Sequence, residues 1–285
     1  MIKIGKFNTM KVEKLVDFGA YLVDPDADAA APKSEILLPQ RYMPDELLPG
    51  DTIDVFVYKD SEDRLIATTE TPFATVGEFA FLEVVQVNDT GAFLDWGLPK
   101  DLLVPYSQQK VRMRRGGVYP VYIYLDDATK RIVASAKIER YLGNVIPDYR
   151  RGDEVDCLVW QHSEIGYKVI VDNLHNGMIY DNEIFRPLEI GQSVQGYVKH
   201  VRDDGKIDIS LSGKTRERVE DLSERIISFL KTNSANGATL SEKSSPEEIK
   251  VRFGCSKKDF KKAVGMLYKD HKVVVSPGGH ITLPE

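Results

Sequence analysis

The sequence predicts a mostly β protein, with three tandem five-stranded OB-fold barrels followed by an α+β winged-helix domain. Three observations predict this fold class. A pattern of about 70 residues occurs three times. Each copy consists of short alternating runs between turn residues. The periodicity becomes helical after residue 214. We therefore expect domains at 1–72, 73–144, 145–214 and 215–285, and a row of similar modules suits a linear ligand better than a small molecule.

The first two copies share four blocks of sequence. The blocks are 17–22 (DFGAYL), 36–39 (ILLP), 58–60 (YKD) and 64–68 (RLIAT) in the first copy, and 89–94 (DTGAFL), 102–105 (LLVP), 125–127 (LDD) and 131–135 (RIVAS) in the second. Aligned on these blocks, Asp60 corresponds to Asp127 and Arg64 to Arg131. A weaker third copy contains 165–169 (IGYKV), 177–180 (GMIY) and 203–210 (DDGKIDIS).

The second copy shows its strands most clearly. Alternating residues at 79–87 predict a first strand, and Asn88-Asp89-Thr90-Gly91 predicts a turn. The remaining four strands are predicted at 92–96, 101–104, 118–125 and 131–135. Five antiparallel strands in a segment this short are typical of a small Greek-key barrel of the OB type, because closure removes the exposed edges of a flat sheet.

These blocks resemble the RNA-binding OB domain first described in ribosomal protein S-one. That domain has a Phe-Gly-Ala-Phe-type second strand and, between strands four and five, an Asp followed four residues later by Arg. The matching residues are Phe18-Gly19-Ala20-Tyr21 with Asp60 and Arg64, then Gly91-Ala92-Phe93 with Asp127 and Arg131, then Gly166-Tyr167. The resemblance implies RNA binding.

The copies depart from that pattern at two positions. Pro39, Pro105 and Tyr180 replace the histidine of the third strand, while Thr90 and Ile165 replace the first aromatic residue. We therefore do not expect every copy to bind RNA, and the two copies with proline are the weaker candidates.

The C-terminal segment predicts three helices and a β-hairpin. Residues 215–231 carry an apolar stripe near period 3.6. Ser245 followed by Pro246 predicts the start of a second helix, and Ser256 the start of a third. Residues 272–283 predict the hairpin. This order is typical of a winged helix, a variant of the helix-turn-helix.

The third predicted helix carries a basic strip made of Lys257, Lys258, Lys261 and Lys262. Residues four apart lie on the same helix face, and Asp259 alone interrupts the run. The third helix of a winged helix usually enters a nucleic-acid groove. We therefore interpret the strip as a phosphate contact; a protein-contact surface or a solvated face is the alternative.

Over the whole chain, the four parts resemble the bacterial conserved virulence factor B family. The resemblance is carried by 91–98 (GAFLDWGL), 100–105 (KDLLVP), 244–249 (SSPEEI) and 256–261 (SKKDFK). It implies a cytoplasmic RNA-binding protein that influences gene expression and has no known catalytic activity.

Charge and composition restrict where nucleic acid can bind. The net charge is −6, but the four parts carry −6, +1, −4 and +3 in chain order. Counterion release requires local Lys and Arg, so we expect phosphate contacts in the second and fourth parts. No apolar run is long enough for a membrane helix, and no signal-peptide core is present at the start. Two distant cysteines fit a reducing cytosol, so we expect a cytoplasmic protein.

RNA binding to an OB barrel requires exposed aromatic rings for base stacking and cations along the backbone path. The candidate residues are Phe18, Tyr21, Arg64, Phe93, Arg112, Arg114, Arg115, Arg131, Tyr167, Lys168, Tyr180 and Lys206. For each aromatic residue, packing in the barrel core is the alternative to RNA contact. Phe18 and Tyr21 lie on opposite faces of a regular strand, unless a bulge at Gly19 brings them together. For the Asp60–Arg64 and Asp127–Arg131 pairs, the alternative to RNA contact is an ion pair that stabilises the turn.

No catalytic constellation is evident, so we expect no enzymatic activity and no cofactor or metal. The five histidines lack metal-ligand spacing. A nuclease whose carboxylates hold Mg²⁺ is the enzymatic alternative. The expected partner is single-stranded RNA. Two non-enzymatic functions compete with RNA binding: an adaptor that docks on the transcription or translation machinery, favoured for the acidic first barrel, and duplex DNA binding through the third helix.

Overall fold

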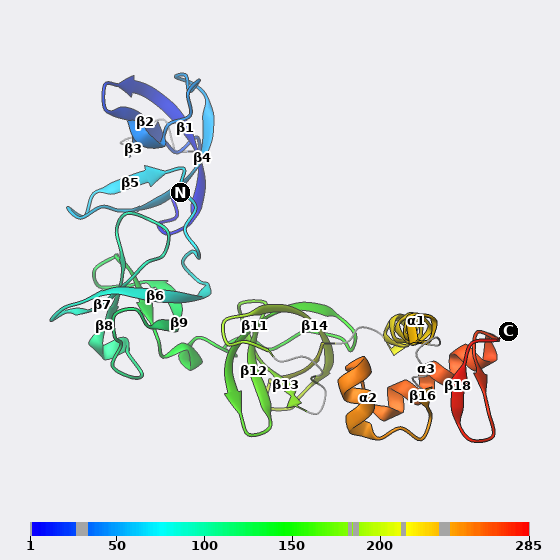
Figure 1. The fold of residues 1–285 in the computed structure, drawn as a ribbon. Helices are drawn as coiled ribbons and strands as arrows, with labels where there is room; N and C mark the ends of the chain where they lie inside the picture. Colours follow the sequence, from blue (N-terminus) through cyan, green and yellow to red (C-terminus); the bar gives the residue numbers. More distant parts are fainter. Residues whose placement is uncertain are drawn as a thin grey trace. The chain divides into compact units, whose positions relative to one another are not determined.

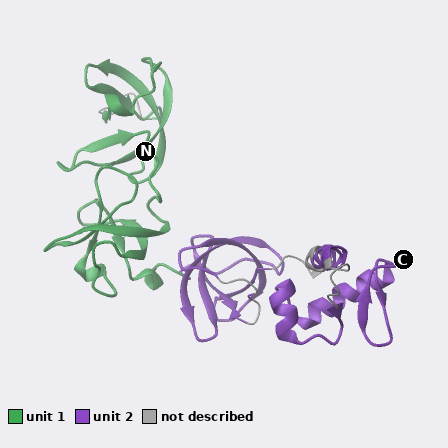
Figure 2. Cartoon of the chain, in the orientation of Figure 1, with its two compact units in different colours: residues 1–142 green, residues 143–285 purple. Residues whose placement is uncertain are grey.

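The computed structural model describes residues 2–26, 34–181, 184, 188–211, 215–233 and 240–284, without the side chains of 215–221 and 233. The chain divides into two compact units, residues 1–142 and 143–285 (Figure 2). Unit 1 holds two closed five-stranded barrels, and unit 2 holds a third barrel and a small α+β region with three helices (Figure 1). The predicted fold class is therefore confirmed.

Barrel 1 consists of β1 (Phe7–Val16), β2 (Gly19–Val23), β3 (Ile36–Pro39), β4 (Thr52–Lys59) and β5 (Leu65–Thr68), hydrogen-bonded in the order β1-β2-β3-β5-β4. The sequence predicts only antiparallel strands, but β3 and β5 pair in parallel. A Greek-key path brings β5 beside β3 in the same direction, and that pairing closes the barrel.

Barrels 2 and 3 repeat this arrangement. Barrel 2 consists of β6 (Phe79–Val87), β7 (Gly91–Leu94), β8 (Leu102–Pro105), β9 (Val118–Leu125) and β10 (Ile132–Ser135). Barrel 3 consists of β11 (Glu154–Ser163), β12 (Gly166–Val171), β13 (His175–Tyr180), β14 (Ser193–Val201) and β15 (Ile207–Ser210). Each again closes through a parallel pair, β8 with β10 and β13 with β15.

A glycine begins the second strand of every barrel because the third strand passes too close for a side chain. The pairs are Gly19 with Pro39, Gly91 with Pro105, and Gly166 with Tyr180. A Cβ atom on these glycines would lie 2.2, 2.3 and 2.2 Å from the carbonyl oxygens of Leu38, Val104 and Ile179. The register thus places Pro39, Pro105 and Tyr180 at equivalent positions, as the sequence pattern predicts.

Barrel 1 has an apolar core of its own, and the end of its β4 also packs into the core of barrel 2. Phe56 and Tyr58 at the end of β4 are buried among barrel 2 side chains. The ring of Phe56 meets that of Trp96 edge-on, with centroids 5.8 Å apart. At the junction Gly5 donates its N–H to Val57 and accepts from Val76. This insertion of barrel 1 side chains into the barrel 2 core holds the two barrels together as one unit.

The C-terminal region consists of α1 (Thr215–Asn233), β16 (Leu240–Ser241), α2 (Pro246–Phe253), α3 (Lys257–Lys269), β17 (Val274–Val275) and β18 (His280–Thr282). The caps follow the sequence prediction: Ser245 accepts the N–H of Glu248, and Gly254 ends α2 in the left-handed conformation at φ 57°. The pattern missed β16, which joins the hairpin in the order β16-β18-β17, because two residues are too short for a periodic signal.

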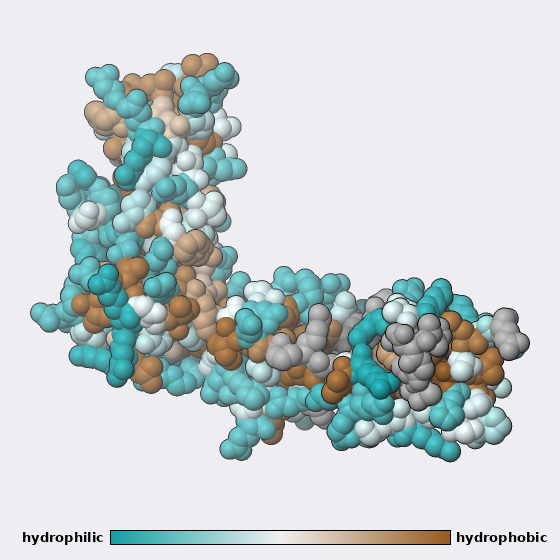
Figure 3. Space-filling view, viewed as in Figure 1, coloured by the Kyte–Doolittle hydropathy of each residue, from teal (hydrophilic) through white to brown (hydrophobic). Residues whose placement is uncertain are grey.

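No helix among the described residues is long and apolar enough to cross a membrane. On the face shown in Figure 3, hydrophobic residues form small groups among hydrophilic ones. Cys157 and Cys255 are both buried, and neither forms a disulfide.

Candidate nucleic-acid interface

Strand register decides which side chains share the outer face of each barrel. Tyr21 lies opposite Leu37, Phe93 opposite Leu103, and Lys168 opposite Met178. These pairs stand two residues from the opening glycine in each second strand, so Tyr21, Phe93 and Lys168 occupy one equivalent position. The intervening residues, Ala20, Ala92 and Tyr167, point to the other face. The face that carries an aromatic in barrels 1 and 2 therefore carries a lysine in barrel 3.

Barrel 1 brings both of its candidate aromatics together. The rings of Phe18 and Tyr21 meet edge-on with centroids 6.3 Å apart, and Phe18 is 57% exposed. Strand alternation does not separate them, because Phe18 lies in the turn before β2 and Gly19 adopts φ 155°. The register irregularity lies in β1, between Val12 and Lys14, and not at Gly19. Lys14 Nζ stands 4.7 Å from the centre of the Tyr21 ring.

Barrel 2 adds an aromatic group that the sequence analysis missed. The guanidinium of Arg112 lies 3.7 Å from the ring centre of Tyr106, whose hydroxyl donates to the carbonyl of Asn88. Tyr106 directly follows β8, where the first copy has Gln40, so the alignment of repeats gave no signal for it. Phe93 is half-buried on the same barrel. Barrel 2 therefore offers two rings and a stacked cation.

The three clustered arginines lie in a loop that is anchored by one apolar residue. Met113 is buried, and its N–H donates to the side chain of Gln109 over 3.1 Å. Arg112, Arg114 and Arg115 are exposed around it. Within the described ranges, none of the three forms an ion pair. The predicted basic cluster is thus present at the surface, and its contact with RNA stays a prediction.

Barrel 3 places its candidates differently from the expectation. Tyr167 packs against the barrel core, and its ring centre lies 4.2 Å from that of His162. The core-packing alternative therefore describes Tyr167. Lys168 Nζ lies 5.4 Å from the ring centre of Trp160, which the sequence analysis did not select. The Tyr180 hydroxyl donates to Asp208 Oδ1 over 3.1 Å.

The turns between strands four and five show that one pairing in the repeat alignment is wrong. The N–H of Asp60 donates to the carbonyl of Arg64, and the N–H of Asp126 donates to that of Arg131. Asp126, and not Asp127, is therefore the counterpart of Asp60. The turn of barrel 2 is one residue longer, and a comparison of sequence blocks cannot detect that difference. Lys206 takes the same position in barrel 3, where its carbonyl accepts the N–H of Arg202.

The cations of two of these turns are each held by a carboxylate of the same turn. Arg64 donates to Asp60 Oδ2 from Nε and Nη2 at 2.9 and 2.8 Å, which matches the turn-stabilising alternative. Lys206 donates to Asp204 over 3.0 Å. RNA contact by either cation has to compete with its pair.

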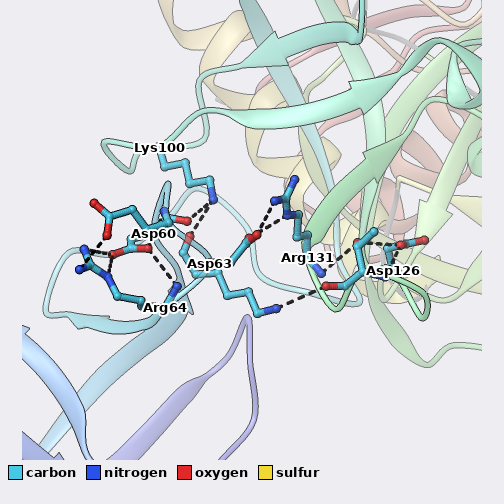
Figure 4. Close-up of polar contacts among 9 residues, drawn as sticks. Asp60, Asp63, Arg64, Lys100, Asp126 and Arg131 are labelled. Atoms are coloured by element: carbon cyan, nitrogen blue, oxygen red, sulfur yellow. Dashed lines mark hydrogen bonds and ion pairs between the residues drawn. The ribbon is translucent and has the colours of Figure 1, made fainter.

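The pairing of Arg131 differs from the sequence expectation. It binds Asp63 of barrel 1 instead of Asp127 (Figure 4). Nε of Arg131 donates to Asp63 Oδ1 over 2.8 Å. The pair therefore joins the two barrels and does not stabilise the turn that contains Arg131.

A lysine bridges the same two barrels without a carboxylate. Lys100 Nζ donates to the carbonyl oxygens of Lys59 and Asp60 at 3.0 and 2.6 Å (Figure 4). Lys59 Nζ in turn donates to the carbonyl of Thr129 over 3.3 Å. Burial lowers the pKa of Lys100. Two lysines, one from each barrel, therefore reach across the junction to backbone oxygens of the other barrel.

We expect Asp63→Asn to weaken the junction at neutral pH and not in acid. The hydrogen bond from Arg131 holds the pKa of Asp63 below its ordinary value of 3.8. A carboxylate with a depressed folded-state pKa stabilises the fold above its unfolded pKa and loses that contribution as pH falls through the folded pKa. The denaturant midpoint can be followed by Trp96 emission in a Trp160→Phe background. The midpoint of Asp63→Asn should lie below that of the protein with Asp63 at pH 7, and the two midpoints should converge in acid.

The matched control for Asp63→Asn is Asp45→Asn, at an exposed position of barrel 1. It should leave the midpoint unchanged at both pH values. A midpoint difference for Asp63→Asn that persists equally in acid would show that the ion pair is not its cause.

The lysine strip of α3 is less interrupted than its sequence suggests. Lys258, Lys261 and Lys262 are exposed, and Lys257 is half-buried. Asp259 is 7% exposed and accepts a hydrogen bond from Ser256 Oγ over 2.8 Å. The acid that interrupts the run in sequence is therefore turned inward as part of the helix cap.

Within the part of the chain that the structure describes, no group of three or more His, Cys, Asp or Glu residues is placed to hold a metal ion.

Two family profiles match parts of this chain. A family profile described as an S1 domain matches residues 4–70 and 76–137, and one described as a CvfB-like winged helix domain matches 224–283. Protein YitL of Bacillus subtilis (strain 168) is 30% identical, covering 96% of this chain and 92% of that protein. Conserved virulence factor B of Staphylococcus aureus (strain MRSA252) is 28% identical, covering 84% and 81%.

A solved structure also covers nearly the whole chain. It is a multidomain protein with nucleic acid binding domains from Streptococcus pneumoniae, 23% identical over 99% of this chain and 98% of that one, with a TM-score of 0.40.

Proposed function

Because the chain belongs to the family of YitL and conserved virulence factor B, with S1 domains and a CvfB-like winged helix domain, we propose that it is a non-catalytic RNA-binding regulator. It grips single-stranded RNA along its barrels and so controls gene expression after transcription. The observation that supports this most is that barrel 2 carries a half-buried Phe93, the stacked Tyr106–Arg112 pair and two further exposed arginines.

The barrels contribute unequally in this proposal. Single-stranded nucleic acid is bound by base stacking on aromatic rings and by a positive path for the backbone. Barrel 2 offers both. Barrel 1 offers Phe18 and Tyr21 but belongs to the most acidic part of the chain. Barrel 3 offers Lys168 and the partly exposed ring of Tyr180. We therefore assign the main RNA contact to barrel 2.

The test is binding of the full-length chain to labelled single-stranded RNA, single-stranded DNA and duplex DNA at two salt concentrations. We expect preference for single-stranded RNA and an affinity that falls steeply with salt, because phosphate contacts release counterions. Absence of binding to all three would contradict the proposal and favour the adaptor, which docks on a protein of the transcription or translation machinery.

A second candidate function, duplex DNA binding through α3, rests on its lysine strip. Replacing Lys258, Lys261 and Lys262 by Ala should then abolish most duplex DNA binding. The matched control replaces Lys243, Lys250 and Lys269, three exposed lysines with the same total charge. Equal effects of the two triple variants would show that net charge, and not a groove-reading helix, governs binding.

We place this activity in the cytoplasm. The support is that neither Cys157 nor Cys255 forms a disulfide, as is usual in a reducing compartment.

A further inference from the structure

A pocket of about 250 Å³ lies where barrel 1 meets barrel 2 within unit 1. Its barrel 2 wall is the outer face of β7, β8 and β10, which contributes Phe93, Leu103 and Val133. Its barrel 1 wall is the end of β4, which contributes Tyr58 and Lys59. Neither barrel forms the pocket alone.

The lining combines aromatic rings with cations, and each barrel contributes both kinds of residue. Three basic residues, Lys59, Lys100 and Arg131, line the pocket, and Asp101 is the acidic residue of its lining. Lys59 and Lys100 direct their ammonium groups to carbonyl oxygens. In the described part of the chain neither lysine forms an ion pair, whereas Arg131 is paired with Asp63. The two lysines are therefore the cations that an anion can reach without breaking an ion pair. A ring that carries a negative group fits this combination, because the ring can stack on Phe93 while the cations neutralise the charge.

The volume of the pocket limits its occupant to about one nucleotide. Pockets for drug-sized ligands usually measure roughly 300–1,000 Å³, and this pocket lies just below that range. One nucleotide is of suitable size, and an oligonucleotide has to pass most of its length outside.

The junction is built to keep the two walls in place. The indole N–H of Trp96 donates to the carbonyl of Lys100 over 2.6 Å, and Lys100 Nζ reaches the barrel 1 carbonyls. The edge-on contact of Phe56 with Trp96 lies beside them. These contacts involve only the protein's own groups, so the pocket is pre-formed and binding requires little rearrangement.

We propose that this pocket is a nucleotide site composed by both barrels, in which one nucleotide of the bound RNA stacks its base on Phe93 and directs its phosphate to Lys59 and Lys100, while Arg131 stays paired with Asp63 beside them. The inference deepens the proposed function and rests on it for the source of the nucleotide. It makes barrel 1, despite its acidity, a direct contributor to binding on barrel 2.

The experiment uses two variants of the full-length chain. Lys59→Ala removes the barrel 1 cation, and Leu103→Trp places a larger side chain in the pocket lining. Lys130→Ala is the control, an exposed lysine of barrel 2 that does not line the pocket. Each protein is titrated with labelled single-stranded RNA over a range of salt, and separately with free AMP and UMP. Circular dichroism confirms that each variant is folded.

Both pocket variants should weaken RNA binding several-fold. Lys59→Ala should also lower the slope of log affinity against log salt by about 0.7, as expected for one phosphate contact on a single strand. The control should change neither quantity by a comparable amount. If wild type binds RNA and both pocket variants match it, the composite site is wrong and the RNA-binding proposal stands.

The free-nucleotide arm separates the two proposals. If wild type binds no RNA but binds AMP or UMP, and both pocket variants lose that binding, the pocket is a site for free nucleotides and the RNA-binding proposal fails alone. If wild type binds neither RNA nor free nucleotide, both proposals are overturned.

Discussion

Replacing Arg112, Arg114 and Arg115 by Ala should weaken single-stranded RNA binding more than any other change in the barrels. Each phosphate contact on a single strand contributes a slope of about 0.7 in log affinity against log salt, so losing three should flatten the dependence by about 2. The reason lies in their placement: all three are exposed and, within the described ranges, none is neutralised by a carboxylate. Fluorescence anisotropy with labelled RNA at several salt concentrations measures both quantities.

A charge-conserving triple variant, with Lys at the same three positions, is the matched control. It retains the phosphate-binding charge, so its salt slope should equal that of wild type. It loses the planar guanidinium that stacks on Tyr106 at 3.7 Å, so a modest loss of affinity is expected. The loop stays anchored in both variants because Met113 remains buried. Equal slopes for wild type and the alanine variant would contradict the assignment of phosphate contacts to this loop.

Gly91→Ala should produce the largest loss of stability in barrel 2. The added Cβ would lie 2.3 Å from the carbonyl oxygen of Val104 and 3.0 Å from the Cα atom of Pro105, both backbone atoms of β8. Backbone in a closed barrel cannot move without shifting a paired strand. Overpacking of this kind typically costs about 1–3 kcal/mol and occasionally more. Urea unfolding followed by Trp96 emission, in a Trp160→Phe background, should show a lower midpoint.

Gly117→Ala in the same barrel is the control for the glycine prediction. Its added Cβ would lie 2.7 Å from the ring of Tyr119, a side-chain end that can rotate away. We expect a clearly smaller shift of the midpoint. Equal shifts for the two variants would indicate that loss of glycine flexibility, and not the close approach of β8, determines the result.

Much of the fold follows from local sequence. The strands Phe79–Val87 and Val118–Leu125 have the predicted bounds, because alternation over eight or nine residues is a strong signal. The cap at Ser245 also follows from neighbouring residues. The repeat itself correctly aligned the three opening glycines, each of which a close third strand requires.

The candidate site was only partly accessible from sequence. Exposed cations and aromatics could be selected by type and turn position, as with Arg112 and Phe18. Their partners could not be selected: Tyr106 and Trp160 lie outside the repeated blocks, and Tyr167 proved to face the core. A one-residue difference in turn length also displaced Asp127 from its expected role.

The sequence by itself determined the number of repeats, the strands within them and the residue types on each face, since these depend on periodicity over a few neighbouring positions. Only the tertiary structure decided that β3 and β5 pair in parallel, that Arg131 reaches Asp63 of the other barrel, and that Phe93 and Lys59 line one pocket. These contacts join residues that the chain separates by tens of positions. Their partners are chosen by how closed barrels pack, and no local pattern records that choice.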